Sequence, residues 1–420
     1  MRKMRDSGIE WIGQIPKGWE LRRAKTLFTQ RNSKGNGIEV LLSPTQKYGV
    51  VPQSQLEGVV QVKEDTDLQM FKTVHKGDFV ISLRSFQGGF EYSLYEGVCS
   101  PAYQVFYPTS PICDTYYRYL FKSQSFISKM NNLTVGIREG KNIQYVDFAN
   151  SQIPVPPLAE QERIAAFLDA ECAEIDAVLE KTRASIEEYK KLKQAVITQV
   201  VTKGVRGDRP MKDSGIEWIG EIPAEWNKDK VIRVFSVIGS GTTPKSSDEN
   251  LFDGNTPWIQ SGDINGENLF VTKNCVSNSA IESYSALRVY QAPYLVVAMY
   301  GASVGNLSLS MIDACVNQAC CILKKPTINL KFSFYIFKAV KDYLARKAVG
   351  GGQPNISQET IKQLWLPIPS ADEQIEISNY LDEKCRSVDA VIAKKQQYLT
   401  EIENYKKSLI YEYVTGKREA

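Results

Sequence analysis

The stretch IPVPPLAEQERIAAFLDAECAEIDAVL (residues 153–179) returns as LPIPSADEQIEISNYLDEKCRSVDAVI (residues 366–392). The two copies align without a gap at an offset of 213 positions, so that Gln161 corresponds to Gln374 and Asp176 to Asp389. Each copy opens with a Pro-x-Pro segment and continues into a long periodic pattern. An internal repeat of this kind indicates a duplicated structural unit.

Both copies carry signals for the start and the end of a helix. Pro157 suits the first helical position, because its missing N–H would have no partner there. Ser370 followed by Glu373 is typical of a capping box, in which hydroxyl and carboxylate each satisfy a free backbone N–H. Gly204 and Gly416 suit C-terminal caps. These signals predict two helices of about 43 residues, each roughly 65 Å long at about 1.5 Å per residue.

Apolar residues between these signals follow a heptad, with eight of ten positions apolar in both copies. Lys193 and Lys406 interrupt the pattern at equivalent sites, where a long charged side chain can set the register of a coiled coil. The pattern predicts that the two helices pack on each other antiparallel rather than acting as core helices of a large domain. Seven of these eight apolar residues in each helix define the predicted seam: Leu168, Cys172, Ile175, Leu179, Ile186, Tyr189 and Val196 in the first helix and Leu381, Cys385, Val388, Ile392, Leu399, Ile402 and Leu409 in the second.

A second repeat precedes each helix. DSGIEWIGQIPKGW (residues 6–19) returns as DSGIEWIGEIPAEW (residues 213–226), at an offset of 207. We call this segment the opening motif. Its tryptophans, Trp11, Trp19, Trp218 and Trp226, are large apolar anchors that form a binding epitope or pack against a helix end, and we favour packing. Each repeated unit therefore consists of an opening motif, a globular part and a long helix.

The two globular parts differ in sequence but share an order of elements. Segments such as DFVISLRS (residues 78–85) and YLVVAMYG (residues 294–301) are rich in β-branched and aromatic residues, as strands are. In the first part, we expect a helix that is capped by Asp114. In the second part, we expect a helix over residues 330–349. Strands followed by helices favour an α+β fold. The predicted boundaries are a first globular domain at 1–152, the first long helix at 153–204, a linker at 205–210, a second globular domain at 211–365 and the second long helix at 366–420.

Composition limits the classes of protein to consider. With 420 residues, 43% hydrophobic and 24% charged, the chain resembles soluble proteins of two or three domains. A net charge of +3 gives no bulk sign of a nucleic-acid partner, so any basic surface must be local. The first residues lack the apolar segment of a signal peptide, and we expect a cytoplasmic location without membrane contact. The eight cysteines form no Cys-x-x-Cys pair and His75 is the only histidine, so we expect reduced thiols and no metal site.

The duplicated frame resembles the specificity subunit of type I restriction–modification systems. The resemblance rests on the paired Pro-x-Pro…Glu-Gln entries, the Leu-Asp turns and the long helix after each, and it covers nearly the whole chain. Two copies at this spacing, each after a strand-rich part, make the pattern specific. The residues that carry it are Pro154, Pro156, Glu160, Gln161, Leu168 and Asp169 in the first copy and Pro367, Pro369, Glu373, Gln374, Leu381 and Asp382 in the second.

In that family, each globular part is a target-recognition domain that reads one half of an asymmetric, bipartite DNA sequence. The resemblance implies two such domains separated by two long antiparallel coiled-coil helices, in a pseudo-twofold repeat. It also implies that the helices dock two methyltransferase subunits, that up to two restriction subunits can join them, and that this chain is not itself catalytic. S-adenosylmethionine, and ATP with Mg²⁺, are expected in the partner subunits, and no cofactor is expected in this chain.

Residues in or beside glycine-containing loops are the candidates for contact with double-stranded DNA. Arginine can donate two hydrogen bonds to guanine O6 and N7, while glutamine or asparagine can pair with adenine. Exposed basic side chains are commonly solvated or bound only to phosphates, so each candidate is a hypothesis. The candidates are Arg84, Gln87, Arg138, Lys141 and Asn142 in the first domain and Lys245, Tyr300, Gln353 and Asn355 in the second.

Two other functions stay open from the residues alone. A self-contained DNA methyltransferase would need a glycine-rich cofactor turn between a strand and a helix. The segment from Gly239 to Gly241 lacks the third glycine of such a turn, and Pro244 disfavours a following helix. A non-catalytic coiled-coil scaffold that recognises proteins would share the long helices and the globular parts. Sequence-selective, salt-dependent DNA binding would separate the specificity subunit from that scaffold.

Overall fold

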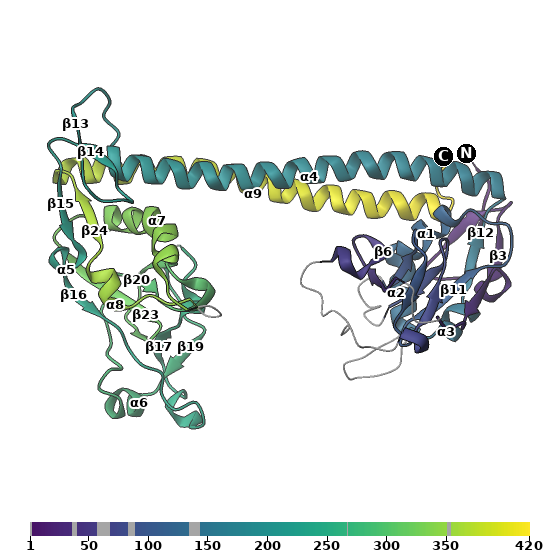
Figure 1. The fold of residues 1–420 in the computed structure, drawn as a ribbon, viewed down its shortest axis with the longest axis horizontal. Helices are drawn as coiled ribbons and strands as arrows, with labels where there is room; N and C mark the ends of the chain where they lie inside the picture. The colour runs from purple at the N-terminus through teal and green to yellow at the C-terminus, as the bar shows by residue number, and fades with distance from the viewer. Residues whose placement is uncertain are drawn as a thin grey trace. The chain divides into compact units, whose positions relative to one another are not determined.

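The computed structural model describes residues 2–35, 40–56, 68–82, 89–133, 143–266, 268–350 and 354–420. The chain forms two compact units, which we call unit 1 (Met1–Arg183 with Gln397–Ala420) and unit 2 (Ala184–Gln396). Each unit contains one globular domain and one half of each of two long helices, α4 (Leu158–Lys203) and α9 (Ala371–Val414). Figure 1 shows both helices with the strands of each domain beside them.

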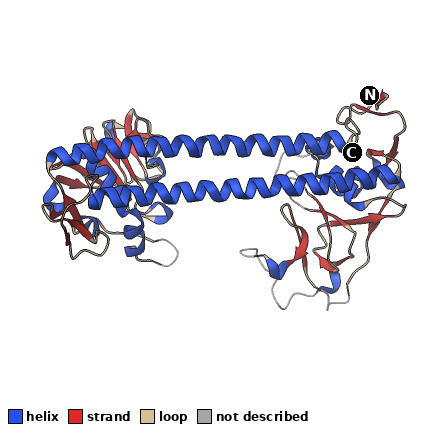
Figure 2. Cartoon of the chain, turned by 90° about the horizontal axis from the view of Figure 1, so that it is seen from above, coloured by secondary structure: helices blue, strands red, loops and turns tan. Residues whose placement is uncertain are grey.

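The helices α4 and α9 lie side by side (Figure 2). In unit 1, Phe167 stacks on Tyr413 with ring centroids 4.4 Å apart, and Arg183 pairs with Glu403 at 2.6 Å. The residue number rises along α4 as it falls along α9, so the pairing is antiparallel. The predicted pair of long antiparallel helices is confirmed.

The two lysines that interrupt the heptad form equivalent ion pairs. Lys193 pairs with Asp389 at 2.6 Å in unit 2, and Lys406 pairs with Asp176 at 2.7 Å in unit 1. The lysines are 213 positions apart and so are the aspartates, so this is one interaction built twice. A charged pair at one level of an apolar seam disfavours neighbouring registers, in which the charges would meet apolar side chains.

Burial along the predicted seam varies with position. Cys172 and Cys385 pack as small apolar side chains, and burial raises the pKa of both thiols. The buried seam residues are Leu168, Cys172, Ile175, Leu179, Ile186, Leu381, Cys385, Ile392 and Leu409, and the half-buried ones are Tyr189, Val196, Val388, Leu399 and Ile402.

Short strands and helices make up each globular domain. Unit 1 contains β1 (Met4–Asp6), β2 (Gln14–Pro16), β3 (Glu20–Arg23), β4 (Phe28–Arg31), β5 (Leu42–Thr45), β6 (Gly49–Pro52), β7 (Lys72–Val74), β8 (Phe79–Ile81), β9 (Phe90–Tyr92), β10 (Gly97–Cys99), β11 (Gln104–Pro108), α1 (Asp114–Lys122), α2 (Gln124–Leu133), α3 (Tyr145–Asn150) and β12 (Gln152–Val155). Unit 2 contains β13 (Met211–Asp213), β14 (Glu221–Pro223), β15 (Asn227–Lys230), α5 (Val231–Val234), β16 (Phe235–Gly239), β17 (Thr256–Ile259), β18 (Asn268–Leu269), β19 (Asn274–Val276), α6 (Asn278–Ser283), β20 (Tyr294–Ala298), β21 (Leu307–Ser310), β22 (Cys315–Val316), β23 (Cys320–Pro326), α7 (Leu330–Lys347), α8 (Gln358–Lys362) and β24 (Trp365–Ile368).

The two domains share one arrangement of strands, which we call the frame. The main sheet of unit 1 has the order β4-β11-β8-β9, and that of unit 2 has the order β16-β23-β20-β21-β18, so β18 is an addition. The opening motifs form the hairpins β1-β2 and β13-β14. The pairs β3-β12 and β15-β24 lead into α4 and α9 in the same register. The domains are thus α+β, as expected.

The cores of the two domains are filled differently. In unit 1, Phe28 packs edge-on against Phe79, Phe106 and Phe121 with ring centroids 5.5 to 5.9 Å apart. In unit 2 the central strand β20 is buried along its whole length, and α7 packs on the same core. Buried aromatic rings and a fully covered strand make each sheet a rigid support for the connections at its edge.

The glutamate of the first Glu-Gln dipeptide joins the opening motif to the long helix in unit 1. Glu160 accepts a hydrogen bond from Nε1 of Trp19 at 3.0 Å and pairs with Arg2 at 2.5 Å. The Arg2 guanidinium also lies over the Trp19 ring, 5.4 Å from its centroid. Trp19 is buried, so it is a packing residue, as predicted.

Unit 2 contains the same three-residue contact. Glu373 accepts a hydrogen bond from Nε1 of Trp226 at 2.8 Å and pairs with Arg209 at 2.6 Å. The Arg209 guanidinium lies 5.2 Å from the centroid of the Trp226 ring. A buried carboxylate that keeps both partners is stable in this place, whereas one that loses a partner is costly.

The glutamine of each Glu-Gln dipeptide fixes the start of a domain helix. The side-chain oxygen of Gln161 accepts from the backbone N–H of Cys113 at 2.9 Å, directly before α1. Gln374 accepts in the same way from Asn329 at 2.6 Å, directly before α7. The repeated dipeptide therefore connects the long helices to both the opening motifs and the domains.

The glycines after the long helices adopt the left-handed conformation of a C-terminal cap. Gly204 has φ +75° and Gly416 has φ +71°. A side chain at Gly416 would also come within 2.5 Å of Pro16 in the opening motif. Both predicted caps are confirmed, and the second is held against the start of the chain.

Four local predictions need correction. Asp114 is the first residue of α1 rather than its cap, which is Cys113. The N–H of Glu373 donates to Ser370 Oγ at 3.4 Å, but the Glu373 carboxylate does not return to Ser370, since it binds the opening motif. Pro157 precedes α4 instead of opening it, and α7 ends two residues before the expected boundary at 349. In the Glu373 case the tertiary contact replaces the local one.

Replacing Arg209 tests the contact in unit 2. The Arg209 side chain is 12% exposed and that of Glu373 is 3% exposed. Arg209→Ala should leave this carboxylate without its charged partner and lower the unfolding free energy by about 3 kcal/mol, as measured by urea denaturation. Arg206→Ala, which breaks an exposed pair with Glu376, is the matched control and should change stability little. Equal losses in the two variants would contradict the assigned role of Arg209.

Glu91 should make the stability of unit 1 depend on pH. Burial raises its pKa to about 7 although Lys122 lies 2.5 Å away and partly opposes the rise. Because the folded pKa exceeds the unfolded one, the unfolded chain ionises first, and stability falls as pH rises between the two values. From about pH 5 to about pH 8, Glu91→Gln should gain about 3 kcal/mol relative to wild type in urea denaturation. The control is Glu96→Gln, at a side chain that is 75% exposed, and its unfolding free energy should depend on pH as in wild type. The same pH dependence in Glu91→Gln as in wild type would contradict the prediction.

Candidate nucleic-acid interface

The DNA-contact candidates of the first domain fall on two connections outside the described residues. Residues 83–88 lie between β8 and β9, and residues 134–142 lie between α2 and α3. Arg84 and Gln87 belong to the first connection. Arg138, Lys141 and Asn142 belong to the second, and all five stay predictions.

The candidates of the second domain fall mainly on the equivalent connections. Tyr300 lies between β20 and β21, which occupy the places of β8 and β9 in the shared strand order. Asn355 lies between α7 and α8, and Gln353 precedes it outside the described residues. Both domains thus carry their candidates at the end of a central strand and in the connection that precedes the long helix.

The structure brings Tyr300 and Asn355 together. Their backbones form an antiparallel bridge, and Gly301 N–H donates to the carbonyl of Pro354 at 2.8 Å. Tyr300 is 44% exposed, and Asn355 is exposed as well. A tyrosine ring and an amide side by side at one edge can contact a base face and a base edge. The arrangement is compatible with base recognition.

Lys245 lies apart from this bridge. It is exposed, and its backbone N–H donates to the hydroxyl of Tyr284, next to α6, at 3.1 Å. Its ammonium group is therefore presented by a different part of unit 2.

Two cavities lie where a domain meets its half of the helix pair. The cavity of unit 1 measures 350 Å³ and lies between α1, the turn from β5 to β6, and the two long helices. The cavity of unit 2 measures 310 Å³ and lies between α7, the connection from β20 to β21, and the two long helices. Each contains the seam ion pair of its unit. Their basic residues are Lys47, Arg118, Lys122 and Lys406 in unit 1 and Lys190, Lys193, Lys338 and Lys341 in unit 2.

Most of these basic residues are not among those predicted from the sequence. Lys122 and Lys338 occupy equivalent places, since Tyr119 and Tyr335, three residues before each, donate to Asp169 and Asp382 at 2.7 and 2.6 Å. The two lysines are 216 positions apart, whereas the frame repeats at 213, so the alignment of the copies does not pair them. Aligning α1 with α7 separately would have shown the equivalence.

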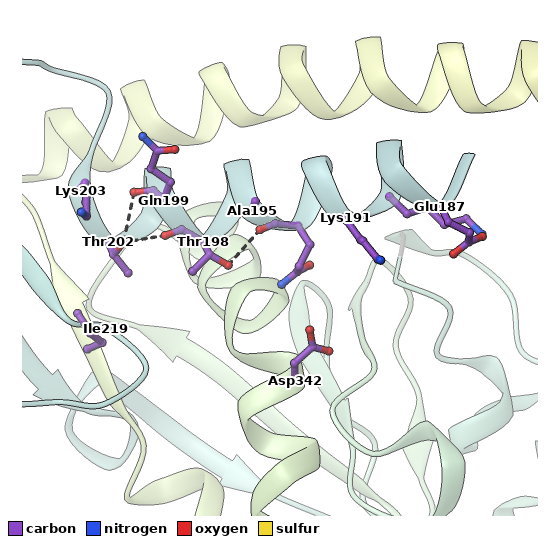
Figure 3. A pocket seen from close by; sticks show the side chains of 11 residues that line it. Glu187, Lys191, Ala195, Thr198, Gln199, Thr202, Lys203, Ile219 and Asp342 are labelled. Carbon is purple, nitrogen blue, oxygen red and sulfur yellow. Dashed lines mark hydrogen bonds and ion pairs between the residues drawn. The ribbon is translucent and has the colours of Figure 1, made fainter. Parts of the chain in front are cut away.

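A further cavity of 820 Å³ lies along α4 above α7 in unit 2 (Figure 3). Thr198 donates its hydroxyl to the carbonyl of Gln194 at 3.0 Å, and Thr202 donates to Thr198 at 2.8 Å. Both hydroxyls thus donate to carbonyls of their own helix, and in the described part of the chain neither donates to a side chain that could act as a base. Asp342 projects from α7 toward this cavity.

The sulfur and imidazole groups are not arranged for catalysis in the described part of the chain. All eight cysteines are free, and burial raises the pKa of Cys320 and of Cys321 to about 12, so these thiols stay protonated. His75 is half exposed, with Nδ1 4.0 Å from Glu96. Over the described ranges, no group of three or more metal-binding side chains could hold an ion. The helices described there include none with the length and apolar character needed to cross a bilayer.

Comparison with known proteins identifies the duplicated frame. The model of the type I restriction modification DNA specificity domain matches residues 16–188 and again residues 223–404. The chain is 24% identical over 430 residues to the putative type I restriction enzyme MjaX specificity subunit of Methanocaldococcus jannaschii, with 97% of this chain and 95% of that one covered. It is 21% identical over 306 residues to the EcoBI specificity subunit of Escherichia coli, covering 70% and 63% of the two chains.

Solved structures show the same fold. A chain from a study of complex assembly and conformational transition in the type I restriction–modification system superposes with a TM-score of 0.73 at 16% identity, covering 96% of this chain and 99% of that one. The HsdS subunit of Thermoanaerobacter tengcongensis superposes with a TM-score of 0.51 at 17% identity, covering 96% and 98%. Since the family model covers both halves of the chain, the protein belongs to the type I restriction–modification DNA specificity family and is a non-catalytic specificity subunit.

Proposed function

We propose that each domain reads one half of an asymmetric, bipartite DNA sequence. The observation that carries this proposal is a shared strand order whose equivalent connections differ in sequence. One frame would place both connections against DNA in the same way, while their different side chains would select different bases. The continuous helices α4 and α9 would fix the number of unread base pairs between the half-sites.

The described residues also support a complex with two methyltransferase subunits. Leu192 on α4 and Tyr405 on α9 are 213 positions apart, and the two residues are 50% and 51% exposed. Two large apolar side chains at equivalent places would suit two copies of one partner. These subunits would hold S-adenosylmethionine, restriction subunits would use ATP with Mg²⁺, and the complex would act on cytoplasmic DNA.

Methylation in a host that lacks other methyltransferases tests the proposed role. The chain would be expressed together with the methyltransferase subunit encoded beside it, and modified bases would be mapped across the genome. We expect one asymmetric motif made of two short half-sites with a constant gap. Absence of new methylation, with both proteins soluble and assembled, would favour a scaffold that recognises proteins.

Exchange of one domain tests whether the two readers are independent. Residues 21–152 would be replaced with the corresponding part of another specificity subunit. The two junctions lie in the paired strands β3 and β12, and both long helices keep their own sequence. Only one half-site of the methylated motif should change, and the gap should stay constant, because the second domain and the helices are untouched. A change in both half-sites would show that the domains do not read separately.

A further inference from the structure

The cavities at the two junctions between domain and helix pair have the same construction. Each is closed on one side by the seam ion pair, Lys406–Asp176 in unit 1 and Lys193–Asp389 in unit 2. Each also has an equivalent isoleucine, Ile410 or Ile197, at its helical wall. The globular parts have otherwise diverged, so a cavity kept in both points to a shared ligand rather than to a particular DNA sequence.

Positive charge exceeds negative charge in the cavity of unit 2. Four lysines line it, and Asp389 is the one carboxylate among its described lining residues. That carboxylate is bound to Lys193 at 2.6 Å. Lys190 pairs at 2.7 Å with Glu187, which lies outside this cavity. Lys341 is exposed on α7, and over the described ranges its ammonium group forms no ion pair within 4.0 Å.

The cavity of unit 1 has the same sign of charge. Four basic residues line it with two carboxylates, Glu91 and Asp176. Both carboxylates are already paired, Glu91 with Lys122 at 2.5 Å and Asp176 with Lys406 at 2.7 Å. Lys47 is exposed, and its ammonium group lies over the Tyr48 ring, 4.9 Å from the centroid. A ligand of either cavity is therefore an anion.

Glycine brings a turn close to each cavity. Gly305 has φ +78°, and a side chain there would come within 3.0 Å of the Lys341 carbonyl. Gly49 has φ +73°, and a side chain there would come within 2.8 Å of the Tyr92 carbonyl. The turn in unit 2 belongs to the connection that also carries Tyr300, so the cavity borders the predicted base-reading edge.

From this geometry we infer that each cavity binds a backbone phosphate of DNA next to the half-site read by its own domain. The inference rests on the proposed function, because it takes DNA as the ligand of both domains. Lysine ammonium groups neutralise phosphates without reading bases, and such contacts position a protein on the duplex. A ligand common to all DNA sequences explains why the cavities are shared while the base-reading connections differ.

Single substitutions in the complete complex with methyltransferase subunits test the inference. Lys341→Ala and Lys47→Ala remove one exposed cation from each cavity. Affinity for a duplex with the methylated motif would be measured by fluorescence anisotropy from about 50 to about 200 mM salt. Each variant should reduce the slope of log affinity against log salt by about 0.9. The ratio of wild-type affinity to variant affinity should therefore fall about threefold from the lowest to the highest salt concentration. Preference for the motif over a mismatched duplex should stay at the wild-type value.

The chain supplies matched controls. Lys181 and Lys394 are exposed lysines 213 positions apart on α4 and α9, and neither lines the cavities. Lys181→Ala and Lys394→Ala should keep the wild-type slope. In ethylation interference, Lys341→Ala should lose sensitivity at phosphates beside one half-site and Lys47→Ala at phosphates beside the other.

The outcomes separate the inference from the function on which it rests. A wild-type complex without motif preference would overturn the proposed function. A wild-type complex with that preference, together with Lys341→Ala and Lys47→Ala variants that keep its slope and its interference pattern, would overturn the phosphate sites alone. Equal slope changes in the Lys181 and Lys394 controls would show a general charge effect and also overturn them. Loss of methyltransferase assembly in the cavity variants, with unchanged DNA affinity, would assign the cavities to an acidic protein segment instead.

Discussion

The frame depends on a carboxylate at the start of each long helix, which is buried in unit 2 and only partly exposed in unit 1. Glu160 in unit 1 and Glu373 in unit 2 each bind a tryptophan of the opening motif and an arginine that precedes the motif. Removing such a carboxylate from water is costly, and the cost is offset only when all of its partners are in place. The contact therefore exists only in the correctly assembled unit. It joins the helix to the opening motif, while the neighbouring glutamine joins the same helix to the domain. The position of the predicted base-reading edge depends on both contacts.

Features that repeat along the chain could be predicted from the sequence. The offset of 213 positions, the heptad and the glycine caps all depend on residues near one another or on a constant spacing. Strands could be recognised because segments such as β20 are rich in β-branched and aromatic residues. Fold class, long antiparallel helices and family follow from these patterns.

Features that depend on tertiary contacts could not be predicted in the same way. Glu373 fits the sequence pattern of a capping box, but its carboxylate binds Arg209 and Trp226 instead of the backbone of Ser370. Lys122 and Lys338 become equivalent only when α1 and α7 are superposed, since insertions between the frames change their spacing. Base contacts depend on connections whose side chains follow no periodic pattern. Tyr300 and Asn355 could be chosen as candidates, but their adjacency is visible only in the fold.

The end of the chain closes the first domain. Tyr116 in α1 donates its hydroxyl to the carbonyl of Val414 at 2.8 Å, and Tyr411 donates to Ile12 at 3.2 Å. Unit 2 is one continuous segment, whereas unit 1 needs both ends of the sequence. Domains made first on the ribosome generally fold first. Here we expect the reverse order, because all residues of unit 2 are translated before the last turns of α9, which unit 1 needs.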